Sequence, residues 1–277
     1  MNDDVLREIV SHANIRSVFR FCQVNKTLCH QHDDLFKQIY ERLYHETGMD
    51  VFKTSEMKWF QLIKLCYLLS RLISILSLED YTMKELYMWT RLNLYDSKIE
   101  VLPPEIGQLI HLQILNLSYN QLSALPPEIG QLIALQTLDV SNNQLSALPP
   151  EIGQLSALQN LSLSNSQLSA LPPEIGQLSA LQKLDLHRNK LSVLPPEIGQ
   201  LSHLQYLYLS NNQLSVLPPE IGQLIDLKTL YVSHNQLSAL PPEIGQLSAL
   251  QLLSLSNNQL SALPPEMGQL EALHIAW

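Results

Sequence analysis

The chain has 277 residues, of which 45% are hydrophobic, and a net charge of −9 at pH 7. This charge comes from residues 100–277, where 13 acidic residues outnumber 4 basic ones, and it excludes nucleic acid as a partner of that region. Only three cysteines are present, and the acidic N-terminus lacks the basic and apolar segments of a secretory signal, which predicts a cytoplasmic protein. Polar residues interrupt the most apolar stretch, 59–78, so we expect no membrane partner.

Residues 1–50 carry apolar side chains at helical spacing, which predicts helices over 3–13, 15–31 and 33–46. The order of these apolar residues resembles the F-box, a short helical module that docks on the Skp1 adaptor of cullin ubiquitin ligases. The resemblance implies that a Skp1-type adaptor binds through Leu6, Ile9, Ile15, Val18, Leu35 and Phe36. In the alternative interpretation, these helices only cap the domain that follows.

Residues 51–88 are expected to form a helical linker and cap, with one helix over 56–78 and a further segment over 79–88. Such a cap would cover the apolar first strand of residues 89–277, because the ends of a repeat array need covering. Cys22, Cys29, His30 and His32 have a spacing that fits no common zinc site. We therefore expect no metal and no other cofactor.

The octapeptide LPPEIGQL begins at Leu102 and recurs every 23 residues up to Leu263, where Met267 replaces the isoleucine. The aligned units read LQxLxLSxNQLSxLPPEIGQLxx. We number them as repeats 1–8, which start at Trp89, Leu112, Leu135, Leu158, Leu181, Leu204, Leu227 and Leu250, and a ninth unit begins at Leu273. Their core, LxxLxLxxNxL, resembles the leucine-rich repeat family, whose units span about 20–29 residues. The resemblance implies an α/β solenoid, a horseshoe with a parallel concave β-sheet, preceded by a small all-α N-terminal domain.

Each repeat predicts the same local structure. The leucines at positions 4 and 6 alternate along a short strand, so both point to one side. The asparagine at position 9 can satisfy backbone groups of a turn, and Ser97 and Ser166 replace it in two repeats, where this ladder should be weaker. Pro-Pro-Glu should begin a tight turn or a single-turn 3₁₀ helix on the convex side. Gly107 and its equivalents should return the chain to the next strand.

The concave face should present positions 3, 5, 7, 8 and 10, which mostly hold Ser, Asn or Gln. The exceptions gather in repeats 5–7: Lys183, Asp185, His187, Arg188, Tyr206, Tyr208, Tyr231 and His234. Tyr and Arg commonly anchor protein interfaces, so we predict that these residues bind a protein ligand. The competing interpretation is neutral variation on an exposed sheet.

Two classes of function remain. The first is an F-box-type substrate receptor, and the second is a stand-alone scaffold or signalling-partner binding protein whose helices act only as a cap. An enzyme is not expected, because the pair His187–Asp185 has no accompanying nucleophile or pocket. F-box-like modules joined to repeats also occur in large DNA viruses, so the near-identical array is compatible with a viral origin.

The C-terminal unit is expected to cover repeat 8 poorly. Continuing the 23-residue period puts Ala276 at an inward leucine position and Trp277 on the concave side. The bare strand edge predicts weak self-association through residues 250–277, unless the natural chain is longer.

Overall fold

The computed structural model describes residues 37, 41, 49–52, 76, 84, 88–270 and 272–277, in a chain that forms two compact units, Met1–Met88 and Trp89–Trp277. In the first unit, Lys37 and Glu41 are helical and their charged groups lie 3.9 Å apart. The 3₁₀ helix η2 (Met49–Phe52) begins at a fully buried methionine. The six F-box-like residues and most of the N-terminal helices that we predict lie outside the described residues.

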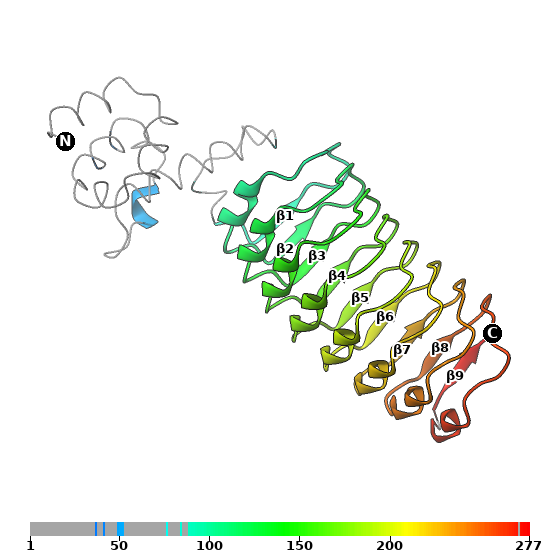
Figure 1. Cartoon of the computed structure of the whole chain (residues 1–277). Coiled ribbons are helices and arrows are strands. Elements are labelled where there is room, and N and C mark those ends of the chain that lie inside the picture. Colours follow the sequence, from blue (N-terminus) through cyan, green and yellow to red (C-terminus); the bar gives the residue numbers. More distant parts are fainter. Residues whose placement is uncertain are drawn as a thin grey trace, which may run out of the picture. The chain divides into compact units, whose positions relative to one another are not determined.

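The second unit is a solenoid with one parallel sheet, in which the strands follow one another in chain order (Figure 1). Each strand has three residues and buries the middle one, except in β9, where that residue is half-buried. The strands are β1 (Arg91–Asn93), β2 (Ile114–Asn116), β3 (Thr137–Asp139), β4 (Asn160–Ser162), β5 (Lys183–Asp185), β6 (Tyr206–Tyr208), β7 (Thr229–Tyr231), β8 (Leu252–Ser254) and β9 (His274–Ala276). Strands β1–β8 thus belong to repeats 1–8, at the same positions in each.

A single-turn 3₁₀ helix lies opposite each of the strands β1–β8, as the Pro-Pro-Glu motif predicts (Figure 1). The helices are η3 (Pro104–Gln108), η4 (Pro127–Gln131), η5 (Pro150–Gln154), η6 (Pro173–Gln177), η7 (Pro196–Gln200), η8 (Pro219–Gln223), η9 (Pro242–Gln246) and η10 (Pro265–Gln269). The second proline starts the turn without cost, because the first helical N–H has no acceptor within the helix. The first proline supplies a carbonyl instead; the O atom of Pro103 accepts from Ile106 N–H at 3.1 Å.

The core lies between the sheet and the 3₁₀ helices. In repeat 3, Leu138, Val140, Leu145 and Ile152 are all at most 1% exposed. Each repeat contributes the same apolar positions to its neighbours, so the core is continuous along the solenoid.

An asparagine ladder joins consecutive repeats along one side of this core. Asn143 accepts from Leu122 N–H at 3.0 Å and donates to the carbonyls of Leu117 and Val140 at 3.0 and 2.9 Å. Equivalent bonds form at Asn120, Asn189, Asn212, Asn235 and Asn258. The side chain thus replaces backbone partners that the turn leaves unpaired, as the sequence predicts.

Repeat 4 interrupts the ladder, because Ser166 is too short to reach across. Its hydroxyl oxygen is buried without a hydrogen-bond partner. Among the described residues, Leu145 N–H also has no acceptor, whereas its equivalents Leu122 and Leu168 bond to the asparagine of the next repeat. The predicted weak point is confirmed.

The glycines of the octapeptide serve a purpose beyond the expected chain reversal. A Cβ atom added to Gly107 would lie 2.7 Å from the carbonyl oxygen of Glu128 in the next repeat. Glycine therefore lets neighbouring 3₁₀ helices approach through their backbones. Gly268, in the last of these turns, would meet nothing within 4 Å.

The prediction for the C-terminal unit is wrong by one residue. Strand β9 pairs Leu253 with Ile275 and Ser254 with Ala276, so Ile275 takes the inward position that we expected for Ala276. A one-residue shift exchanges the two faces of a strand, and it places the larger apolar side chain against the core. Trp277 follows the strand and is 63% exposed.

Candidate functional site

The solvent-facing side of the sheet, which we call the sheet face, carries the predicted residues in two rows. Strand pairing places Lys183 beside Tyr206 in the first row. In the second row, Asp185 lies beside Tyr208, which in turn lies beside Tyr231. The in-register repeat therefore brings together residues 23 positions apart in the sequence.

An aromatic pair occupies the second row. The rings of Tyr208 and Tyr231 meet edge to face, with centroids 5.3 Å apart and an interplanar angle of 66°. The Nζ atom of Lys183 lies 5.4 Å from the centroid of the Tyr208 ring, within range of a cation–π interaction. Tyr208 thus contacts both Lys183 and Tyr231.

A depression of about 340 Å³ opens beside this pair. It is lined by Lys183, Asp185, His187, Tyr208, Ser210, Asn211 and Tyr231. A cation, a carboxylate, an imidazole and two phenols therefore face the same space, so the depression offers both polar and apolar contacts.

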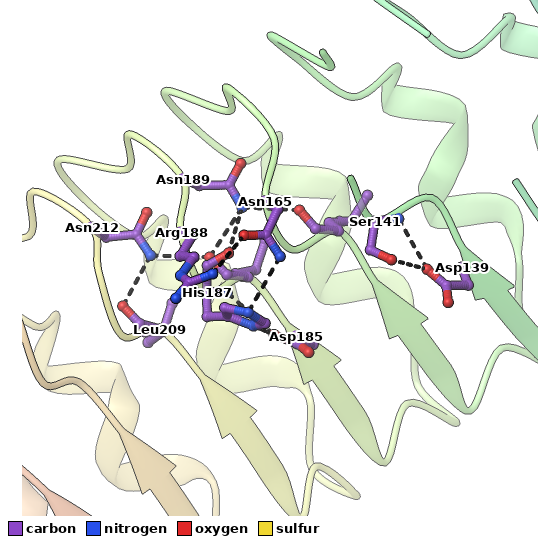
Figure 2. Close-up of polar contacts among 11 residues, drawn as sticks. Asp139, Ser141, Asn165, Asp185, His187, Arg188, Asn189, Leu209 and Asn212 are labelled. Atoms are coloured by element: carbon purple, nitrogen blue, oxygen red, sulfur yellow. Dashed lines mark hydrogen bonds and ion pairs between the residues drawn. The ribbon is translucent and has the colours of Figure 1, made fainter. Parts of the chain in front are cut away.

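A chain of polar contacts runs along the edge of the depression, from repeat 5 to repeat 4 (Figure 2). The Nδ1 atom of His187 lies 2.7 Å from Asp185, and its Nε2 atom lies 3.5 Å from the amide nitrogen of Asn165. Arg188 donates to the amide oxygen of Asn165 at 3.5 Å. This pattern is satisfied when His187 is neutral and carries its proton on Nδ1, because Nε2 then accepts from Asn165.

Part of the role of Asp185 is structural. In repeats 2 and 3, Asn116 and Asp139 accept from the backbone N–H and the hydroxyl of the serine two residues later, at 2.9 and 2.6 Å in both cases. Asp185 makes the corresponding contacts with His187, through the backbone N–H at 3.2 Å and the ring at 2.7 Å. Tyr208 and Tyr231 occupy the same position in repeats 6 and 7, where no oxygen atom is available for this bond. The two tyrosines therefore do not stabilise the end of the strand in the way that Asn116, Asp139 and Asp185 do.

Position 8 of every repeat adopts a left-handed backbone conformation, with φ between 50° and 60°. The residues there are Asp96, Tyr119, Asn142, Asn165, Arg188, Asn211, His234 and Asn257. Asparagine and aspartate tolerate this conformation best, because their short side chains bond locally. Tyr119 and Arg188 are therefore costly for the backbone, and such residues are often retained for a function.

The phenol of Tyr208 is affected by its surroundings. Partial burial raises its pKa above the ordinary value, and Tyr231, Asp185 and Tyr206 raise it further. The phenol therefore remains a neutral hydrogen-bond donor near pH 7.

The structure leaves three predicted residues, Arg188, Tyr206 and His234, outside the lining of the depression. Tyr206 is 37% exposed beside Lys183 but does not line it. His234 contacts Asn257 of the next repeat, with its Nε2 atom 3.1 Å from the amide nitrogen. Sequence reasoning missed Asn165, Ser210 and Asn211, because Ser and Asn are the ordinary residues at these positions.

Neither a cluster of metal-binding side chains nor a membrane-spanning helix is present in the part of the chain that the structure describes. No three His, Cys, Asp or Glu side chains among these residues lie close enough to share an ion. None of the described helices has the length and apolarity needed to cross a membrane.

Comparison with known protein families agrees with the repeat geometry. The model of a leucine-rich repeat region matches residues 82–167, 150–213 and 196–275. The chain belongs to the leucine-rich repeat family. A search of curated proteins gave no match.

Solved leucine-rich repeat structures share this fold. The ectodomain of the Arabidopsis thaliana receptor kinase GASSHO1/SCHENGEN3, in complex with CASPARIAN STRIP INTEGRITY FACTOR 2, is 38% identical over 64% of this chain and 22% of its own, with a TM-score of 0.59. A TDR receptor is 31% identical over 68% of this chain and 34% of its own, with a TM-score of 0.63. The plant peptide hormone receptor RGFR1, in complex with RGF2, is 33% identical over 64% of this chain and 33% of its own, with a TM-score of 0.51. The chain thus spans about a third or less of the length of these receptors.

Proposed function

We propose that the chain is a protein-interaction module and that the sheet face of repeats 5–7 binds its partner. The observation that carries this proposal is the contact of Tyr208 with both Lys183 and Tyr231 beside an open depression. Tyrosine offers a large apolar ring and a polar group, a combination that is frequent where proteins bind one another. Two similar receptors were solved in complexes, with CASPARIAN STRIP INTEGRITY FACTOR 2 and with RGF2, which supports a binding role.

We further propose that residues 1–50 dock on a Skp1-type adaptor, so that the chain acts as a substrate receptor of a cytoplasmic ubiquitin ligase. The support is the F-box-like order of Leu6, Ile9, Ile15, Val18, Leu35 and Phe36. In this arrangement the N-terminal segment recruits the ligase and the repeats select the substrate. The second candidate is a stand-alone scaffold or signalling-partner protein, whose N-terminal residues only cap the solenoid.

Substitution of the tyrosines tests the binding face. Partners are first identified by affinity purification and mass spectrometry, and their affinity is then measured by titration. Tyr208→Ala and Tyr231→Ala should each weaken binding by about 1–2 kcal/mol, with little change in melting temperature. Val193→Ala is the control, because Val193 is an exposed residue away from the strand and other repeats have alanine at its position. Normal binding by both Tyr208→Ala and Tyr231→Ala would contradict the proposal.

Gel filtration of the full chain with purified Skp1 distinguishes the two candidates. A substrate receptor should co-elute with Skp1 at tens of micromolar, and Leu6→Glu with Ile9→Glu should abolish the complex. If the unsubstituted chain does not co-elute, the scaffold function remains.

A further inference from the structure

Half of the positive charge on the solenoid belongs to one repeat. Of the six basic residues in 89–277, Lys183, Arg188 and Lys190 belong to repeat 5 and lie on the sheet face. Arg188 and Lys190 donate to the amide oxygens of Asn165 and Gln167, at 3.5 and 3.2 Å. Among the described residues, neither Lys183 nor Arg188 has a carboxylate within ion-pair distance. Two cations therefore remain available for a ligand in an otherwise acidic solenoid.

The carboxylate of this repeat's sheet face does not neutralise them. Asp185 is engaged by His187, through the ring at 2.7 Å and the backbone N–H at 3.2 Å. The sheet face of repeat 5 therefore carries three cations and one carboxylate, and its net charge is positive. Charge complementarity therefore favours an acidic partner segment here.

The surroundings of these cations are aromatic on one side. Tyr208 and Tyr231 belong to the next two repeats, and their rings meet edge to face at 5.3 Å. At the same position in repeats 2 and 3, Asn116 and Asp139 make local hydrogen bonds that stabilise the end of the strand. Tyrosine cannot make these bonds, so the local backbone does not require either ring. The two tyrosines thus offer an apolar anchor directly beside the cations.

The spacing of the repeats fixes the spacing of the groups that could bind. Neighbouring strands lie about 4.8 Å apart, so the midpoint of the tyrosine pair is about 7 Å from repeat 5 along the sheet. In an extended peptide, residues i and i+2 point to the same side and are also about 6.6 Å apart. An extended segment that crosses the strands can therefore present alternate side chains to the cations and to the rings.

We propose that this surface recognises an extended partner segment in which an acidic residue and an aromatic or large aliphatic residue stand two positions apart. The acidic side chain pairs with Lys183, which lines the depression, and Arg188 adds positive charge from the side of repeat 4. The apolar side chain packs against Tyr208 and Tyr231. This inference rests on the proposed protein-binding function and adds the chemistry and spacing of the ligand. Repeats without cations or tyrosines on the sheet face lack this specificity.

Selection from random dodecapeptides displayed on phage tests the proposal with the full chain as bait. Three variants serve as parallel baits, each built from residues that other repeats have at the same positions, so that the fold is kept. Lys183→Thr with Arg188→Asn removes the cations, Tyr208→Asn with Tyr231→Asn removes the rings, and Lys228→Gln removes a cation outside the surface. Selected peptides are then synthesised and titrated against all four proteins.

The unsubstituted chain and Lys228→Gln should enrich peptides with Asp or Glu two positions from Phe, Tyr, Trp or Leu. Binding of these peptides should weaken about tenfold or more in each double variant, and it should also weaken with added salt. Peptides that need the tyrosines but contain no acidic residue at this spacing would overturn the inference and leave the proposed binding face intact. Peptides that bind all four proteins equally, or no enrichment at all, would overturn both.

Discussion

Repeat 3 ends its strand with Asp139, Ser141 and Asn142, whereas repeat 5 ends it with Asp185, His187 and Arg188. The backbones are nearly the same, since Asn142 and Arg188 both have a φ of 54°. The local contacts also correspond, because the residue two positions after each aspartate bonds to its Oδ1 atom. Repeat 3 shows what the scaffold requires, and the residues by which repeat 5 differs are those that the scaffold does not explain.

The comparison fails if the two repeats do not share one scaffold, and their ladder asparagines test this. Asn143→Ser and Asn189→Ser should each lower the free energy of unfolding by about 2–4 kcal/mol, because each leaves a buried N–H without an acceptor and two carbonyls with fewer donors. Urea unfolding followed by circular dichroism measures both values. Clearly unequal losses would show that repeats 3 and 5 are held together differently.

The convex side offers a second test of the shared scaffold. Cβ atoms on Gly153 and Gly199 would each lie 2.6 Å from a glutamate carbonyl of the next repeat. Gly153→Ala and Gly199→Ala should therefore each lower the free energy of unfolding by about 1–3 kcal/mol. Gly268→Ala is the matched control and should lose nothing, because no atom lies within 4 Å of its Cβ position. A loss of the same size at Gly268 would contradict close packing as the cause.

Most of the scaffold could be predicted from the sequence, because each of its elements depends on a local pattern repeated eight times. The alternating leucines predict the strands, Pro-Pro-Glu predicts the 3₁₀ helices, and the asparagine at position 9 predicts the ladder. The register of β9 could not be predicted in this way. It depends on whether Ile275 or Ala276 fills the space beside Leu253, which is a matter of packing rather than of period.

The candidate site was only partly accessible from the sequence. The row Asp185–Tyr208–Tyr231 follows from the period, but its binding role stays a prediction. The depression also requires Ser210 and Asn211, which give no signal because similar residues stand there in other repeats. Likewise, the link from Arg188 through Asn165 to His187 depends on side-chain conformations that a repeat alignment does not contain.

The comparison becomes sharper if the defect in repeat 4, which separates repeats 3 and 5, is repaired. Ser166→Asn should restore the bond from Leu145 N–H and raise the free energy of unfolding by about 1–2 kcal/mol. Ser156→Asn, on the exposed surface of the same array, should have no effect. Hydrogen exchange at Leu145 measures the restored bond directly, and unchanged exchange in Ser166→Asn would show that the gap is filled in another way.

An exchange of residues at the left-handed position tests the difference between the two repeats most directly. Arg188→Asn should raise the free energy of unfolding by about 1 kcal/mol, and Asn142→Arg should lower it by a similar amount, because asparagine tolerates a positive φ better than arginine. The bond from Arg188 to Asn165 is long, at 3.5 Å, so its loss should offset little of this gain. Thermal unfolding of both variants, alone and combined, measures the two effects and their additivity. If Arg188→Asn instead destabilises the chain, the arginine is part of the scaffold, and repeat 5 differs from repeat 3 for a structural reason rather than for binding.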